Sequence, residues 1–391
     1  MGIVVTGVGV VSALGIGVVK NLASIRKGES GISAVPKILK TTNQLPVGEL
    51  PMTNEELHVM LGIDPGEHLS RTALLGMLAV KEAMACVDID FSKRVGLVSS
   101  TSVGGMDLSE HFFEDFIEDD SKGRLRDVKM HDCAASTDVI ARYCGINSYT
   151  TTISTACSSA ANAVIAGAKL LKHNIVDYVV VGGSDALSAF TLNGFKSLMI
   201  LDEKHCRPFD ATRAGLNLGE GAGYLLMQRE EDAASYYCRL GGFSNRNDAH
   251  HQTASSEEGN GAYLAMSEAL QMAKLSPEDV SYINAHGTGT GNNDASESAA
   301  FIRLFGDKMP PFSSTKAFTG HTLAAAGGIE AVFSVMAISQ NCRYPNLNFM
   351  TPIPEYGLKP VVNYEENVSV DSVLTNSFGF GGNCSSLLFT K

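Results

Sequence analysis

The sequence lacks paired cysteines and has no excess of positive charge. None of its eight cysteines forms a Cys-x-x-Cys pair, and 30 Lys and Arg stand against 42 Asp and Glu, a net charge of −12. The missing pairs, together with the lack of a recognisable targeting segment, favour a reducing, cytoplasmic setting. The shortage of positive charge argues against nucleic acid as a partner.

Charge is also absent from the first 19 residues. No basic stretch precedes the apolar part, and five glycines with Thr6 and Ser12 interrupt it. These features disfavour a signal peptide or a membrane span, so we expect a buried first strand and no membrane association. The run Gly7-Val-Gly9-Val-Val-Ser12 resembles a dinucleotide-binding loop, but Ser12 occupies the position of its third glycine. We therefore do not expect a bound nucleotide.

A second charge-free stretch, between Arg142 and Lys169, contains Cys157. Apolar residues recur at helical spacing after Cys157, which predicts a buried helix that begins near this cysteine. The unpaired N–H groups at a helix start can lower a thiol pKa from about 8.5 to roughly 3.5–7.5, which would make Cys157 a nucleophile. The alternative is a small buried apolar residue, the role we expect for the other seven cysteines.

Two histidines lie in loops rich in glycine and threonine. His286 belongs to Asn284-Ala-His286-Gly-Thr288-Gly-Thr290, and His321 ends Lys316-Ala-Phe-Thr-Gly-His321. Loops that follow the carboxyl ends of strands commonly carry sites in α/β proteins, although each histidine could instead be structural. A thiol with two imidazole donors suits chemistry on thioesters.

The coarse pattern is one of alternating strands and helices, which predicts layered α/β halves with a boundary near residue 235. The expected helices cover residues 70–86, 137–143, 261–273, 297–305 and 324–339. The expected strands cover residues 3–6, 95–99, 177–183, 221–228, 280–284, 312–314, 373–378 and 385–390, the last two forming a hairpin.

Five motifs in order carry a resemblance to a known family. They are Thr155-Ala-Cys157-Ser-Ser, Arg207-Pro-Phe-Asp210, the two histidine motifs and Asn376-Ser-Phe-Gly-Phe380-Gly-Gly. Together they resemble the β-ketoacyl-acyl carrier protein synthases, the elongating condensing enzymes. The resemblance implies the α/β thiolase-like fold, with two related halves in five layers (αβαβα). We assign these halves to residues 1–235 and 236–391.

The resemblance also implies roles for the central residues. Cys157 is the nucleophile, and Phe380 is a gate whose backbone N–H forms an oxyanion hole with that of Cys157. His286 and His321 are the catalytic histidines. We expect His321, before a helix start, to be neutral and to donate through Nε2–H, given an acceptor for Nδ1.

Further residues match family positions around this centre. Lys316 pairs with Glu330 in the family pattern, and the alternative is a surface ion pair. Thr288 and Thr290 match positions that hold pantetheine, although turn hydroxyls often bond only their local backbone. The remaining substrate positions are the aromatic Phe378 and the acyl-pocket residue Val103, for which simple packing is the alternative.

The implied reaction is a decarboxylative Claisen condensation of an acyl group on Cys157 with malonyl-acyl carrier protein. It requires no metal and no resident cofactor, because phosphopantetheine arrives on the carrier protein. We expect a homodimer, with a heterodimer of related subunits as a second option. Gly291-Asn292-Asn293-Asp294 departs from the family pattern, which leaves fatty acid and polyene- or polyketide-type pathways open. A degradative thiolase using coenzyme A, with Cys384 as second cysteine, and a non-catalytic chain-length subunit are the alternative functions.

An acidic carrier protein needs a basic docking surface despite the net charge of −12. A short basic run offers one, although such runs are often only solvated loops. The candidates are Lys122, Arg124, Arg126 and Lys129 in that run, with Arg71, Lys204 and Arg207 elsewhere.

Overall fold

The structure is a computed structural model in which residues 2–391 are described. The main strands are β1 (Ile3–Ser12), β3 (Val95–Ser100), β4 (Thr150–Ile153), β5 (Tyr178–Asp185), β6 (Gly221–Arg229), β7 (Cys238–Asn247), β8 (Tyr282–Asn284), β9 (Phe312–Ser313), β12 (Ser372–Gly379) and β13 (Asn383–Thr390). Short strands are β2 (Gly15–Ile16), β10 (Cys342–Arg343) and β11 (Glu365–Glu366). The helices are α1 (Val18–Lys27), α2 (Asn54–Leu61), α3 (Arg71–Met84), α4 (Met106–Glu118), α5 (Leu125–Val128), α6 (Cys133–Tyr143), α7 (Ser159–Lys172), α8 (Ala189–Ser197), α9 (Asn260–Ala273), α10 (Gly291–Phe305), α11 (Lys316–Thr319) and α12 (Ala326–Gln340).

The strand order shows that the two halves repeat one topology. The path runs β4-β3-β5-β6-β1-β7-β13-β12-β8-β9. Read from each outer edge inward, both halves place their third, second, fourth, fifth and first main strands in that order. The two first strands, β1 and β7, meet antiparallel, with Val4 opposite Arg239 and Val5 opposite Cys238.

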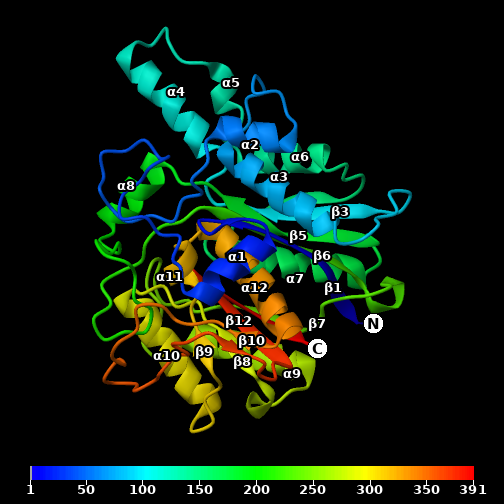
Figure 1. Ribbon diagram of the computed structural model, residues 1–391, viewed down its shortest axis with the longest axis vertical. Helices are drawn as coiled ribbons and strands as arrows, with labels where there is room; N and C mark the ends of the chain where they lie inside the picture. Colours follow the sequence, from blue (N-terminus) through cyan, green and yellow to red (C-terminus); the bar gives the residue numbers. More distant parts are fainter. Residues whose placement is uncertain (1) are drawn as a thin grey trace.

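Helices cover and separate the two halves of the sheet, as the thiolase-like prediction requires (Figure 1). The central layer consists of α7 and α12, which contact each other; α12 also packs on β6 of the first half and β12 of the second. The outer layers are formed by α3 on the first half and by α9, with α10 beside it, on the second. The five-layer α/β fold predicted from the sequence is confirmed.

Three elements begin or end four or more residues from their predicted positions. Helix α6 begins at Cys133 rather than residue 137, because the Asp132 side chain accepts the backbone N–H of Ala134 and caps the helix there. The first strand continues to Ser12 rather than residue 6, because all ten of its residues are buried. The helix after His286 begins at Gly291 rather than 297, because the Thr290 side chain accepts the backbone N–H of Asn293 and caps it there.

One segment within residues 2–391, Leu323–Gln340, is long and apolar enough to cross a membrane by composition. In the fold, 89% of it is buried inside the protein. This segment contains the central helix α12, so its apolar character serves the core. A helix that is apolar on all sides is expected between two covered sheets.

Candidate functional site

Cys157 lies in the turn between β4 and α7, just before the first residue of the helix. The preceding residue, Ala156, has a φ of 51°, in the left-handed region that is costly for a residue other than glycine. The hydroxyl of Ser159 donates to the carbonyl of Ala156 at 2.5 Å and accepts the N–H of Thr155 at 2.8 Å. The turn therefore presents the thiol at the helix start, as predicted.

The Cys157 thiol is buried, and burial disfavours its ionised form. Burial raises the pKa of Cys157 to about 11, while Lys316 and the backbone N–H groups of Phe380 and Cys157 pull the pKa down less strongly. The expected low pKa is therefore wrong, because loss of solvation outweighs the favourable helix start. The two N–H groups that face the sulfur are the pair predicted to form an oxyanion hole.

A glycine allows the β12–β13 hairpin to approach the nucleophile turn. A side-chain carbon on Gly379 would lie 3.0 Å from the carbonyl oxygen of Thr155 and 3.2 Å from the amide nitrogen of Cys157. A side chain at this position would require the hairpin and the nucleophile turn to move apart by a few tenths of an ångström. Gly379 therefore allows the close packing that brings Phe380, the next residue, near the thiol.

His286 and His321 face each other across the site. Their ring centroids are 5.4 Å apart and their planes are 87° apart. Nδ1 of His286 lies 3.2 Å from the Lys316 ammonium, and Nδ1 of His321 accepts the backbone N–H of Leu323 at 3.1 Å. Because both Nδ1 atoms accept, both Nε2 atoms carry a proton and can donate. The partner of His321 Nδ1 is thus a donor, not the acceptor expected from the sequence.

Burial keeps both imidazoles neutral. It lowers the pKa of His286 and of His321 well below their ordinary value, and the nearby Lys316 charge acts in the same direction. The pKa of His286 is lowered further by His321. Two neutral N–H donors are therefore present at neutral pH, as the sequence predicted for His321.

Lys316 and Glu330 form an ion pair in the interior. Their side chains are only 2% and 3% exposed, which rules out a surface pair. The Lys316 ammonium also donates to the backbone carbonyl of His286 at 2.5 Å. Burial raises the pKa of Glu330 to about 7, and Lys316 opposes this shift. Lys316, held by Glu330, thus contacts both the ring and the backbone of His286.

Glu297 was missed in the sequence. It is fully buried on α10, and its carboxylate accepts the backbone N–H groups of His286 and Gly287 at 2.9 and 2.8 Å. Asn376 also donates to it, at 3.2 Å. The sequence analysis began a helix at residue 297 and gave Glu297 no role. Thr290, a capping residue seven positions earlier, was the signal for an earlier helix start.

The predicted nucleophile and both predicted catalytic histidines line one cavity of about 160 Å³. Its lining includes Cys157, His286, His321, Thr288, Thr290, Phe378, Phe380 and Cys384. The two threonine hydroxyls are 2.9 Å apart, and that of Thr290 also caps α10. The two threonines thus bond local groups and also line the cavity, and their contact with pantetheine stays a prediction.

A second cavity, of about 380 Å³, lies beyond Phe380. Cys157 and Phe380 line both cavities, and Val103 lines the second one, as expected for an acyl-pocket residue. The ring of Phe380 stacks on Phe195 of α8, with centroids 6.0 Å apart. Phe380 and Cys157 therefore lie at the boundary between the two cavities.

Two of the predicted docking residues are engaged inside the protein and are not free for docking. Arg71 is only 5% exposed and donates two hydrogen bonds to Glu220, at 2.9 and 2.7 Å, so it belongs to the interior. Arg207 bonds Asp202 and the carbonyl of Thr212, so its charge is already neutralised. A sequence shows the charge of an arginine but not the acidic side chain with which it pairs in the fold.

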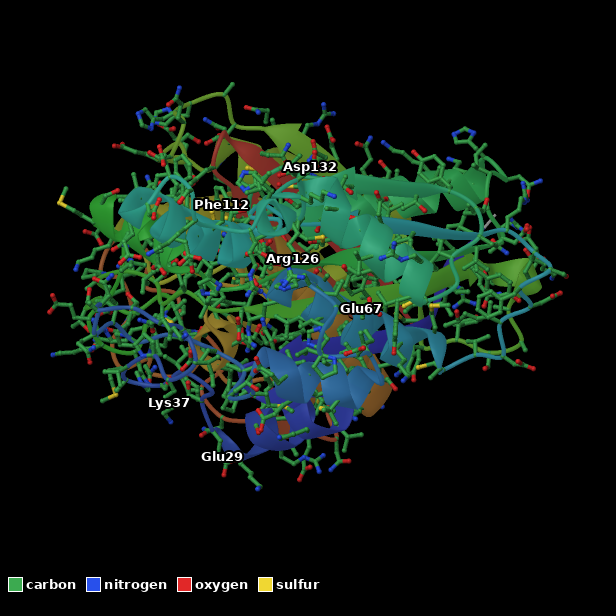
Figure 2. The ribbon with its side chains drawn as sticks, turned by 90° about the horizontal axis from the view of Figure 1, so that it is seen from above. Glu29, Lys37, Glu67, Phe112, Arg126 and Asp132 are labelled. Atoms are coloured by element: carbon green, nitrogen blue, oxygen red, sulfur yellow. The ribbon has the colours of Figure 1, made fainter. Side chains whose placement is uncertain are left out.

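The other five docking candidates are exposed. Lys122, Arg124, Arg126 and Lys129 lie on and around α5, where Arg126 can be followed in Figure 2. Lys122 pairs with Glu118 of α4 at 2.9 Å, and Lys204 is exposed on a separate loop. Four basic side chains are thus exposed around α5, with the exposed acids Glu118, Asp119 and Asp120 just before them, and their part in docking stays a prediction.

Comparison with known proteins agrees with this geometry. Residues 1–233 match the family described as "Beta-ketoacyl synthase, N-terminal domain", and residues 237–350 match "Beta-ketoacyl synthase, C-terminal domain". The 3-oxoacyl-[acyl-carrier-protein] synthase 2 of Staphylococcus aureus is 32% identical, covering 100% of this chain and 98% of its own. A putative mitochondrial 3-oxoacyl-[acyl-carrier-protein] synthase of Schizosaccharomyces pombe is also 32% identical, covering 100% of this chain and 99% of its own.

Solved ketosynthases have the same fold. The ishigamide ketosynthase/chain length factor superposes with a TM-score of 0.94 at 27% identity, covering 100% of this chain and 99% of its own. The ketosynthase ApeO of Xenorhabdus doucetiae, solved in complex with its chain length factor ApeC, gives 0.86 at 30% identity, covering 100% and 98%. With both family domains matched and full-length relatives at this identity, the chain belongs to the β-ketoacyl synthase family.

Proposed function

We propose that this chain catalyses the decarboxylative condensation of an acyl group on Cys157 with malonyl-acyl carrier protein, giving 3-oxoacyl-acyl carrier protein. The observation that carries the proposal is the single cavity lined by Cys157, His286 and His321. One side chain in it can hold an acyl group, and two neutral imidazoles can hold a developing oxyanion.

In the first stage the Cys157 sulfur attacks the carbonyl carbon of an acyl thioester. The N–H groups of Cys157 and Phe380 stabilise the tetrahedral oxyanion, each contributing about 3 kcal/mol to lowering the barrier. The bond to the pantetheine sulfur then breaks, and the pantetheine thiol leaves with the proton that Cys157 gave up. The acyl chain occupies the chamber beyond Phe380, lined by Val103.

In the second stage malonyl thioester enters along Thr288 and Thr290. His286 and His321 donate from Nε2 to its thioester oxygen while carbon dioxide leaves and the bond electrons form an enolate. The enolate carbon attacks the acyl carbonyl, a carbon–carbon bond forms, and the bond to Cys157 sulfur breaks. A proton from solvent restores the thiol. Phosphopantetheine is part of the carrier substrate, so the chain needs no resident cofactor.

The proposed partners are an acyl carrier protein and a second ketosynthase-like subunit in the cytoplasm. The arm formed by α4 and α5 projects from the layers (Figure 1). Large apolar side chains on it are exposed, Phe113 by 58%, Ile117 by 68% and Leu125 by 76%, which favours coverage by another subunit. Structural relatives include a ketosynthase with its chain length factor, so a heterodimer is as open as a homodimer.

The test is acyl loading of Cys157 followed by elongation. The protein is incubated with a panel of acyl-carrier proteins, and intact mass shows which acyl group it accepts. Cys157→Ala should accept none, and loaded wild-type protein should elongate with malonyl but not acetyl thioester. Elongation with acetyl-coenzyme A would instead indicate a thiolase, for which Cys384 already lines the cavity. Unchanged activity of a complex containing Cys157→Ala would indicate a non-catalytic chain-length subunit.

A further inference from the structure

Helix α8 forms one side of the chamber beyond Phe380. Phe190, Thr191, Gly194 and Phe195 of this helix line the cavity of about 380 Å³, and Leu198 follows at its end. The opposite side comes from the nucleophile turn and the Val103 loop. The width of the chamber therefore depends on where α8 sits.

The helix itself is weakly held by packing. Of its nine residues only Thr191 and Leu192 are buried. The neighbouring Phe190 is 64% exposed. A short helix is not stable by itself. Leu192 and Phe195 of α8 pack in a small apolar cluster, and polar contacts at the ends of the helix help to set its position.

A carboxylate from another helix holds the first turn of α8. Glu110 of α4 accepts the backbone N–H of Ala189 at 3.2 Å with one oxygen and that of Phe190 at 3.0 Å with the other. Ser188 accepts the next free N–H, that of Thr191, at 3.1 Å. Negative charge at a helix start also interacts favourably with the helix dipole.

A second contact holds the later part of α8. Asn43 donates to the side chain of Asn193 at 2.8 Å and accepts from the Lys196 ammonium at 2.6 Å. The two ends are thus fixed by polar contacts from separate segments. Glu110 is the contact at the end nearest Phe190, where the chamber wall begins.

The position of α8 also bears on the gate. Phe195 stacks on Phe380 with centroids 6.0 Å apart and planes 18° apart. A tilt of α8 would change the surface on which the Phe380 ring rests. Glu110 does not line the chamber, so any effect it has on the acyl group must pass through this helix.

We propose that Glu110 is a positioning residue that seats the α8 wall of the acyl chamber and so sets which acyl lengths Cys157 accepts. The inference rests on the proposed function, because it places the acyl chain in this chamber. A two-carbon acyl group ends near the thiol, whereas longer chains reach α8. Loss of Glu110 should therefore alter discrimination among long chains and leave acetyl loading unchanged.

The experiment compares Glu110→Ala, Glu110→Gln and the wild-type protein. Each is loaded with a series of saturated acyl-carrier proteins from two to sixteen carbons, and kcat/KM for acylation of Cys157 is obtained from intact mass. The control is Glu114→Gln, one turn further along α4 at an exposed position. Thermal unfolding followed by circular dichroism accompanies each variant, and the isosteric glutamine variant preserves the test if alanine impairs folding.

We expect Glu110→Ala to reduce chain-length discrimination by about tenfold, the effect of a lost helix cap. Discrimination here is kcat/KM for the preferred acyl chain divided by kcat/KM for a chain four carbons longer. Glu110→Gln, which keeps one acceptor oxygen, should fall between alanine and wild type, and Glu114→Gln should match wild type. An unchanged length profile, or an equal loss for all chains including acetyl, would overturn the proposal. Failure of the wild-type protein to take any acyl group would refute the proposed function instead.

Discussion

At the scale of single residues, the site depends on which buried groups remain uncharged. Cys157 is 6% exposed, and His286 and His321 are each 2% exposed. At such burial the neutral form of each group is favoured. After burial, the charge of Lys316 is the next largest influence, and it acts to lower the pKa of Cys157 and of both histidines. The state of the reacting residues thus depends on burial first and on one buried lysine second.

The raised pKa of Cys157 predicts how alkylation depends on pH. Below a pKa of about 11 the thiolate fraction grows about tenfold per pH unit, and the thiolate is the nucleophile. Iodoacetamide should therefore modify Cys157 about tenfold faster at pH 8 than at pH 7, and faster again at pH 9. Peptide mass spectrometry would follow the rate, with the exposed Cys86 as internal reference. A rate that levels off near pH 7 would show that the helix start outweighs burial.

Substitution of either histidine should slow elongation but not acyl loading. His286→Ala and His321→Ala should still load an acyl group but elongate it about 100-fold or more slower, the effect of losing one oxyanion donor. Single-turnover loading and elongation, measured separately, would test this. A variant that elongates at nearly the wild-type rate would refute the role of that histidine.

The low pKa values of His286 and His321 also predict how elongation responds to pH. Their pKa values lie well below the ordinary 6.5, so both imidazoles stay neutral as the pH falls from 8 to 6. Wild-type elongation of preloaded enzyme should not decline over this range through their protonation. Glu330, with a pKa of about 7, titrates in the same range, so NMR of the two imidazoles is the direct measurement. A His286 or His321 signal that titrates between pH 8 and 6 would contradict the neutral assignment.

At the scale of elements, the layers are held together by close approaches between backbones. Strand β6 crosses the central helix α12, and Gly223 lies at the crossing. A side-chain carbon on Gly223 would be 2.3 Å from the amide nitrogen of Ile329 and 2.4 Å from the carbonyl carbon of Gly328. Neither neighbour is a flexible side chain, so the helix itself would have to move.

Substitution at this crossing should therefore destabilise the protein. Gly223→Ala should lower the free energy of unfolding by about 1–3 kcal/mol through overpacking. Gly194→Ala on α8, where nothing lies within 4 Å, should instead raise it by roughly 0.5–1 kcal/mol, because alanine favours a helix over glycine. Urea unfolding of both variants checks the contrast. Equal stabilities would mean that β6 and α12 can separate at little cost.

At the scale of the whole molecule, charge is unevenly distributed. The net charge is −12, yet Lys122, Arg124, Arg126 and Lys129 are exposed together around α5. Such a local patch can attract an acidic partner even on an acidic protein, mainly by raising the association rate. The arm that carries these residues also exposes apolar side chains, and it lies at one end of the molecule (Figure 1).

Charge reversal tests the patch. Arg124→Glu with Arg126→Glu should raise the apparent KM for carrier-bound substrate about tenfold and leave a small pantetheine thioester unaffected. The wild-type preference should fade above roughly 0.15 M salt, where the screening length is about 8 Å. Lys93→Glu, exposed before the start of β3, is the control. Equal losses on both substrates would mean that the arginines support the fold instead of docking.

The sequence by itself determined the order of the motifs, the alternation of strands and helices and the residues that meet at the site. Local spacing placed Cys157, His286 and His321 beside helix starts or strand ends, and the resemblance to the condensing enzymes assigned them to one site. The division near residue 235 stays a prediction, although β6 ends at Arg229 and β7 begins at Cys238. Local pattern suffices where position along the chain sets position in the fold.

Only the tertiary structure decided the state of those groups and their support. Burial raised the pKa of Cys157 against the effect of its helix start, and Glu220 drew Arg71 into the interior. Glu297 reaches the backbone of His286, and Glu110 reaches the start of α8 from a helix 79 residues earlier. Solvation and partners depend on what the folded chain brings together from distant segments, so no local pattern could specify them.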